Sequence, residues 1–144
     1  VLVWFNDECS YAVCVGLEPA WGMGGARAMN KLFTVHLNDQ NGIKFDQDKT
    51  FGVENLRSAF NQVRLLVANR YYESGNYVGL DVKAMRSTSD EDSYEHLKNS
   101  LAVFKALEEK VDHYDNAYAQ KLIDDRKFEQ LEMYVMNLIM GISK

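Results

Sequence analysis

Three short apolar runs, each followed by a polar or acidic residue, constrain the fold of this chain more than any other feature. The runs lie near residues 1–6, 32–37 and 77–82 and are rich in β-branched and aromatic side chains. Continuous runs of this kind are typical of parallel strands that are buried on both faces. Stretches with helical spacing separate them, so the order strand, helix, strand, helix, strand, helix predicts a parallel α/β fold.

The helical stretches differ in how clearly the sequence marks them. Apolar residues recur at helical spacing from Leu56 to Val67 and from Tyr94 to Val111, and residues 115–144 predict two more helices. Pro19 and the glycines at 22, 24 and 25 favour only a short, irregular helix over residues 26–30. We expect residues 1–112 to form three βα units and residues 113–144 to form a helical tail.

Each predicted strand ends in a side chain that can bind a metal ion: Glu8, His36 and Asp81. Carboxyl ends of neighbouring parallel strands meet at one edge, which is the functional face of a (β/α)8 barrel. Asp46 and Asp48 lie two residues apart, so both carboxylates can face one ion in an extended chain. Carboxylate oxygens suit hard divalent cations, and imidazole suits Mn²⁺, Co²⁺ or Zn²⁺.

A second interpretation of these acids needs no metal. Acidic side chains often cap helices at the start of loops, and Lys44 and Lys49 are close enough in sequence to pair with Asp46 and Asp48. His36 could likewise be a hydrogen-bonded histidine within the sheet. Both interpretations remain open at the level of composition and spacing.

Composition limits the partners of this chain. A formal net charge of −5 argues against nucleic acid and against an anionic membrane surface as partners. No apolar run reaches the ~18 residues that cross a bilayer, and the first residues do not resemble a signal peptide. We expect a reduced, cytoplasmic protein, in which Cys9 and Cys14 are core thiols. Because the chain opens on a strand-like run, we also expect it to be a fragment of a longer protein.

The stretch around the second run resembles the xylose isomerase family. Residues 31–48 read KLFTVHLNDQNGIKFDQD, and the family pattern is KLFHIDLNGQ followed by a short turn and KYDQD. Leu80-Asp81-Val82-Lys83 and Arg86 resemble the family's FDFKPPR segment at the last barrel strand, and residues 6–11 fall on its NPEVGH motif. The resemblance covers about residues 3–110, and KFDQD is its most specific part.

The resemblance implies the C-terminal portion of a (β/α)8 TIM barrel, with residues 1–112 as its last three βα units. In that family two divalent metals hold an open-chain sugar for a 1,2-hydride shift between aldose and ketose. The implied metal ligands are Glu8, His36, Asp46, Asp48 and Asp81, and Glu8 and Asp48 are the implied catalytic groups. The implied cofactor is Mn²⁺, Mg²⁺ or Co²⁺, with Zn²⁺ as an alternative.

Two positions depart from the family pattern in ways that alter the metal site. Tyr11 stands where the family has a histidine ligand of the catalytic metal, and His36 stands where it has an aspartate ligand of the structural metal. A phenol is a poor Mg²⁺ ligand, and an imidazole favours softer ions. Asp39 matches a family glycine, so we expect Asp39→Asn to affect metal binding far less than Asp48→Asn.

The resulting functional hypothesis is a metal-dependent aldose–ketose isomerase whose metal site is altered. A sugar epimerase on the same scaffold and a non-catalytic sugar-binding or assembly relative are the alternatives. The expected partners are a monosaccharide substrate and the missing N-terminal half of the barrel. Met133, Met136 and Met140 form an apolar stripe in the tail that is either core or a subunit contact. We expect a homo-oligomer, because the resemblance implies C-terminal helices that embrace neighbouring subunits.

Overall fold

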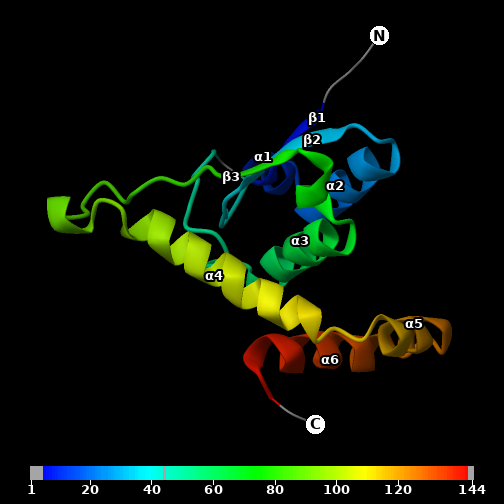
Figure 1. Ribbon diagram of the computed structural model, residues 1–144. Helices are drawn as coiled ribbons and strands as arrows, with labels where there is room; N and C mark the ends of the chain where they lie inside the picture. The colour runs from blue at the N-terminus through cyan, green and yellow to red at the C-terminus, as the bar shows by residue number, and fades with distance from the viewer. Residues whose placement is uncertain (1–4, 44, 143–144) are drawn as a thin grey trace.

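Three parallel strands form the sheet of this protein, which we describe from a computed structural model (Figure 1). The structure describes residues 5–43 and 45–142, and for residues 5–8 it describes the backbone alone. The strands are β1 (Phe5–Glu8), β2 (Leu32–Leu37) and β3 (Tyr77–Leu80), in the order β1-β2-β3. Both pairings are parallel, which confirms the predicted arrangement.

The predicted strand positions agree with the structure, with small differences at their ends. The second run forms β2 over the predicted residues, and β3 ends at Leu80 rather than at residue 82. Residues 1–4 of the first predicted strand lie outside the described residues, and the observed strand continues to Glu8. The register places Glu8 beside His36 and His36 beside Gly79, so the ends of the strands are aligned.

The helices follow the strands in the predicted order. The clear helical patterns correspond to α3 (Leu56–Ala68) and α4 (Glu95–Asp112), and the tail forms α5 (Asn116–Asp124) and α6 (Phe128–Met140). A short helix, α1 (Cys9–Cys14), begins directly after β1. Within the part of the chain that the structure describes there are also two short 3-10 helices, η1 (Tyr71–Ser74) and η2 (Asp90–Asp92).

The prediction for the segment after Pro19 was wrong. This segment is one regular helix, α2 (Pro19–Ala28), and it contains all three glycines. Pro19 is in the first turn, where its missing N–H has no intrahelical partner to lose. Met23 and Ala26 are buried on the helix face that packs inward, and their burial outweighs the low helix propensity of the glycines.

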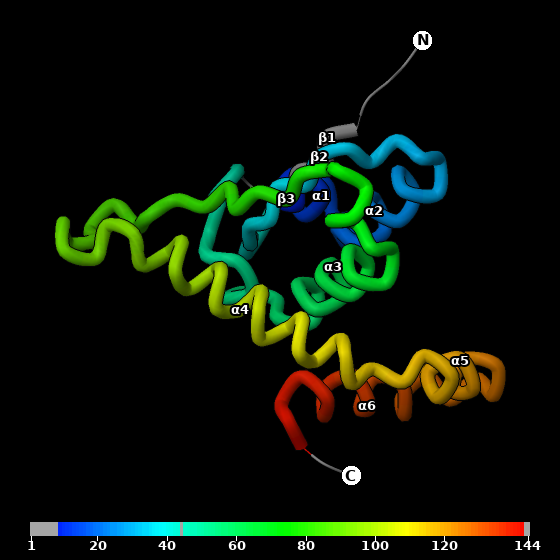
Figure 2. The backbone as a smooth tube through the Cα atoms, viewed as in Figure 1, coloured from blue at the N-terminus to red at the C-terminus, as the bar shows by residue number. Residues whose placement is uncertain are grey.

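The hydrophobic core lies between the sheet and the helices. Val35 and Leu37 are fully buried on one face of β2, where they join Phe60, Val63 and Leu66 of α3. Helix α4 packs against α3 and touches β3, and α6 contacts α3 and α4 (Figures 1 and 2). Thr34 and His36, at alternate positions of β2, therefore lie on the face of the sheet opposite these helices.

No helix within the described residues is long and apolar enough to span a membrane.

Candidate metal centre

Residues that can bind metal lie at the carboxyl ends of the three adjacent strands. Glu8 is the last residue of β1, and its backbone is in register with that of His36 near the end of β2. Asp81 directly follows β3, and its backbone N–H donates to the carbonyl of Leu37 at 3.2 Å. The parallel register thus brings three positions from separate parts of the sequence to one edge of the sheet.

His36 and Asp81 form a close pair of predicted ligands. Nδ1 of His36 lies 3.5 Å from Oδ2 of Asp81, and the two side chains are 32% and 52% exposed. A Cβ at Gly79, the neighbour of His36 in β3, would lie 3.7 Å from Cδ2 of the imidazole. That distance is an ordinary van der Waals contact, so the imidazole packs beside this position of β3 while both it and its carboxylate partner stay partly exposed.

The donor chemistry of this pair fits a divalent cation. An imidazole nitrogen and a carboxylate oxygen suit Mn²⁺, Co²⁺ or Zn²⁺ better than Mg²⁺, which prefers oxygen ligands alone. Two protein ligands do not complete a coordination sphere, and Glu8, beside His36 in register, is the position from which a third could come. The side chain of Glu8 lies outside the described residues.

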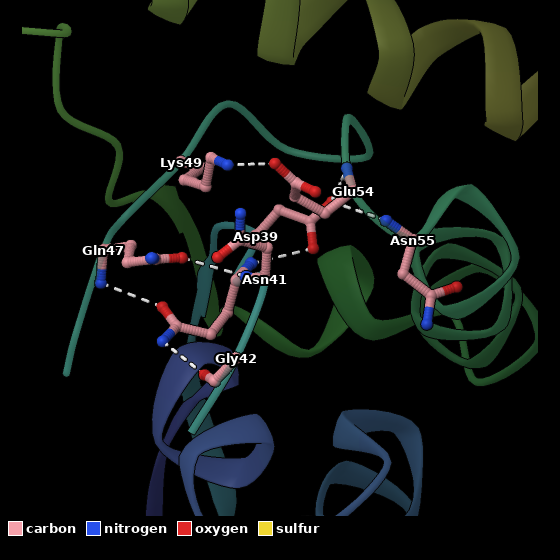
Figure 3. A network of polar contacts seen from close by, with 8 residues as sticks. Asp39, Asn41, Gly42, Gln47, Lys49, Glu54 and Asn55 are labelled. Carbon is pink, nitrogen blue, oxygen red and sulfur yellow. Dashed lines mark hydrogen bonds and ion pairs between the residues drawn. The ribbon is translucent and has the colours of Figure 1, made fainter. Parts of the chain in front are cut away.

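Asp39 organises the loop that follows β2 (Figure 3). Its carboxylate is buried and accepts hydrogen bonds from the backbone N–H groups of Gln40 at 2.9 Å, Glu54 at 2.8 Å and Asn55 at 3.1 Å. Its own backbone forms a two-bond antiparallel bridge with Lys49. Asp39 thereby ties both ends of the loop together, and its role is structural.

Two glutamines hold the outer part of the same loop (Figure 3). Gln40 donates from its amide to the carbonyls of Gly42 and Phe45 at 2.7 and 2.5 Å, and its Oε1 accepts from the backbone of Gln47 at 2.9 Å. The side chain of Gln47 in turn accepts from the backbone of Asn41 at 2.9 Å. These bonds fix the course of the backbone on either side of Asp46 and just before Asp48.

Asp48 is the most constrained of the predicted ligands. Its side chain is 3% exposed, and its backbone has the left-handed φ of 46°, which is uncommon for a residue with a side chain. Oδ1 accepts from Nδ2 of Asn38 at 2.9 Å, and Oδ2 forms an ion pair with the ammonium of Lys83. Both carboxylate oxygens of Asp48 are therefore engaged by groups of the protein.

Lys83 follows β3 by three residues and reaches across to the loop after β2. Its ammonium is largely exposed, and the hydrogen bond and charge of Asp48 raise its pKa, with further contributions from the charges of Asp46 and Asp81. The ammonium is charged at neutral pH even at its ordinary pKa, and the upward shift strengthens that preference. A permanent positive charge thus lies among three carboxylates predicted as metal ligands.

Asp46 has a different partner. Its Oδ1 accepts a hydrogen bond of 2.5 Å from the hydroxyl of Ser10 in α1. The next residue, Tyr11, at the position where the resemblance implies a histidine, is 59% exposed. Beside Asp46 and Lys83 a hollow of about 740 Å³ opens between the loops after β2 and β3, and Arg86 and His96 also contribute to its wall.

The structure thus divides the predicted ligands into two groups. In the first group, His36 lies close to Asp81. In the second group, Asp46 is bonded to Ser10, and Asp48 is bonded to Lys83 and Asn38. Among the side chains that the structure describes, no three from histidine, cysteine, aspartate and glutamate gather around a point where a metal ion could bind. Convergence of all five residues, which includes Glu8, remains a prediction.

The alternative of simple pairing with nearby lysines is not borne out for Lys49. That ammonium pairs with Glu54 instead of Asp46 or Asp48. Lys44 lies outside the described residues.

Sequence reasoning assigned no role to Ser10 or Lys83. Lys83 stands two residues after Asp81, and this spacing in extended chain was the available signal that both face the same site. Ser10 had no comparable signal, because its contact with Asp46 joins residues 36 positions apart.

Comparison with known proteins shows what the chain as a whole is similar to. No protein-family model matches the chain. The xylose isomerase of Thermus thermophilus is 30% identical over 109 residues, which are 76% of this chain and 27% of that protein. The xylose isomerase of Thermus caldophilus is 28% identical over 109 residues, which are again 76% of this chain and 27% of that protein. The chain therefore spans about a quarter of the length of these relatives, and over three quarters of its own length it is distantly similar to xylose isomerases.

Proposed function

We propose that this chain is the C-terminal part of a (β/α)8-barrel sugar isomerase that interconverts an aldose and a ketose with the help of a divalent metal ion. The observation that carries the proposal is the alignment of three parallel strands whose ends bear Glu8, His36 and Asp81. Distant similarity to xylose isomerases supports the reaction class.

The barrel rests on what surrounds the sheet. β1 and β3 are the outer strands, and an unpaired edge in a parallel sheet normally pairs with a further strand. An apolar hollow of about 510 Å³ lies between β3 and α4, lined by Val78, Leu80, Leu101 and Phe104 among others. Further polypeptide, corresponding to the part of the relatives that this chain does not span, would cover these surfaces and close the barrel.

The proposed ligands of the metal are His36 and Asp81, with Glu8 beside them in register. A divalent ion held there would polarise the carbonyl and hydroxyl oxygens of an open-chain sugar. The reaction moves the hydrogen on C2, with its bonding electrons, to C1, while the proton of the C2 hydroxyl ends on the oxygen of C1. Glu8 and Asp48 are the carboxylates proposed to manage this proton, as the resemblance implies.

Assembly into a homo-oligomer is a further part of the proposal. Met133 and Met140 of α6 and Phe128 at its start are exposed. Exposed apolar side chains grouped on one helix are a common feature of subunit contacts.

The test is conversion of aldose to ketose by the full-length protein with Mn²⁺ or Co²⁺. Activity should require the ion, and Asp81→Asn should weaken binding of the ion by about 100-fold or more, since even outer-sphere changes cost 10–100-fold. Asp112→Asn, an exposed aspartate at the end of α4, is the matched control. Absence of ketose from every pentose and hexose tried, or equal behaviour of the two variants, would refute the proposal.

A further inference from the structure

The hollow of about 740 Å³ beside Asp46 and Lys83, here called the loop hollow, is walled by three segments of the chain. They are the loop after β2, the loop after β3 and the first two turns of α4. The chain after β3 runs outward to η2 and returns as α4 (Figures 1 and 2). Cavities of ~300–1,000 Å³ are typical of small-molecule sites, and α/β proteins bind ligands beyond the carboxyl ends of their parallel strands. The loop hollow therefore has the size and the position of a ligand site.

Ionised groups of both signs line the loop hollow in nearly equal number. The cations are Lys49, Lys83 and Arg86, and the carboxylates are those of Asp46, Glu54, Asp92 and Glu95. All of them except Arg86 have an ion-pair or hydrogen-bond partner within the chain. Neither a phosphate nor a metal ion would meet a strong field of opposite charge at such a wall. The balance favours a neutral, polar ligand.

Two polar groups on this wall have no partner among the residues that the structure describes. Nδ1 of His96, in the first turn of α4, is buried and makes no hydrogen bond. A buried polar atom without a partner is costly, and a hydrogen bond to a ligand would remove that cost. The guanidinium of Arg86 is exposed and offers five N–H donors in a fixed plane. Both groups are free to bond to the hydroxyls of a ligand.

Three apolar side chains of the same wall are exposed: Phe45, Val53 and Met85. They lie in the two loops, outside the hydrophobic core. A sugar ring presents C–H groups on its faces and hydroxyls, which both donate and accept, around its rim. Aromatic and methionine side chains can pack against such faces while polar groups bond to the rim. The mixture of groups in the loop hollow therefore suits a sugar ring better than a purely apolar or an ionic ligand.

We propose that the loop hollow binds a second sugar unit, so that the preferred substrate of this isomerase is a disaccharide whose reducing end lies at the metal site. This inference rests on the proposed function and names its substrate class. Asp46 and Lys83 connect the two places, because both line the loop hollow while Asp46 is a predicted ligand and Lys83 pairs with Asp48. The reducing unit opens at its own C1 and keeps its glycosidic bond, so the reaction needs no step beyond the hydrogen transfer already proposed.

A comparison of sugars tests the inference. Initial rates of ketose formation by the full-length protein with Mn²⁺ are measured on xylose and glucose and on their 1,4-linked disaccharides, xylobiose and cellobiose. We expect kcat/KM for at least one disaccharide to exceed that of its monosaccharide by about 10-fold or more, the equivalent of one or two additional hydrogen bonds. Monosaccharides converted as efficiently as their disaccharides, or better, would overturn the inference and leave the proposed function standing. Conversion of none of the four sugars would overturn both.

Variants of the wall test where the second sugar unit lies. Arg86→Met and His96→Gln each remove a bonding group, so each should lower the ratio of disaccharide to monosaccharide kcat/KM by about 5- to 10-fold, mainly through KM for the disaccharide. The matched controls are Arg70→Met, at an exposed arginine that pairs with Glu73, and His113→Gln, at the other end of α4. Both controls should keep the ratio of the parent.

Circular dichroism establishes that each variant is folded. Arg86 is exposed, so its replacement leaves the fold intact and keeps the test valid even if His96→Gln is unstable. A folded Arg86→Met protein with the disaccharide preference of the parent would refute the placement of the second sugar unit in the loop hollow. A preference lost equally in Arg70→Met would refute it as well, because that side chain lies outside the wall.

Discussion

Replacement of Asp39 should destabilise the loop that carries Asp46 and Asp48. The carboxylate of Asp39 accepts three backbone hydrogen bonds, two of them on Oδ2 from Glu54 and Asn55 and one on Oδ1 from Gln40. Asp39→Ala leaves all three donors without this acceptor. At about 1 kcal/mol for each lost bond, the low end of the cost of an unsatisfied buried donor, the free energy of unfolding should fall by about 3 kcal/mol.

The amide variant should have a smaller effect. Asparagine can keep its oxygen toward Glu54 and Asn55, but its NH₂ group cannot accept from Gln40. It also removes a negative charge from the N-terminal end of α3, where a carboxylate is favourable. We therefore expect Asp39→Asn to cost about 1–2 kcal/mol, well above the roughly 0.5 kcal/mol expected for the exposed control Asp112→Asn.

Urea denaturation of the full-length protein measures the global effect, and hydrogen exchange measured by mass spectrometry locates it. Peptides that contain the amides of Gln40, Glu54 and Asn55 should lose protection in both Asp39 variants, while peptides from α6 should not. If Asp39→Ala unfolds at the same urea concentration as Asp112→Asn, or the loop amides keep their protection, the structural role of Asp39 is wrong.

Two further predictions concern close packing and pH. Gly52 has a φ of 81°, and a Cβ there would lie 2.7 Å from Cγ1 of Val103. Gly52→Ala should therefore lower the free energy of unfolding of the full-length protein by about 2 kcal/mol, measured by urea denaturation. An unchanged midpoint would contradict the packing described. Asp48 raises the pKa of Lys83 above its ordinary value of 10.5. The stability that this ion pair contributes is therefore fully present below pH 10.5 and is lost as the pH rises through the raised pKa. The difference in unfolding midpoint between the parent and Lys83→Met should be equal at pH 7 and pH 9 and should shrink above roughly pH 10.5; a difference that shrinks between pH 7 and pH 9 would contradict the ion pair.

The parallel sheet could be predicted from sequence because its signals are local. The run at residues 32–37 is continuous and β-branched, and polar residues bound it on both sides, so β2 was located without error. The amphipathic pattern that became α3 is equally explicit, since Phe60, Val63 and Leu66 share one buried face. Periodicity within a few turns of chain suffices for such elements.

Helix α2 escaped prediction because tertiary packing outweighed local propensity. Three glycines and a proline in ten residues argue against a helix when only propensity is considered. The structure places Pro19 in the first turn and buries Met23 completely, and neither fact can be obtained from the local sequence.

The candidate site was predictable in its residue types and not in its pairings. Acidic residues after strands indicated which side chains reach the edge of the sheet. The contacts of Ser10 with Asp46 and of Lys83 with Asp48 depend on how two loops meet, and they join residues 36 and 35 positions apart. Asp39 illustrates the same limit, because its match to a family glycine gave no sign that its carboxylate accepts backbone hydrogen bonds from Glu54 and Asn55.

The most direct test of the central claim follows one hydrogen atom. The full-length protein with Mn²⁺ is given an aldose that carries deuterium on C2, and the ketose is analysed by ²H nuclear magnetic resonance. The account predicts ketose with the deuterium on C1, because the hydrogen moves with its electrons and does not exchange with water. Ketose or epimer with the deuterium lost to solvent would indicate proton abstraction instead, and the absence of any conversion would contradict the assignment of an isomerase.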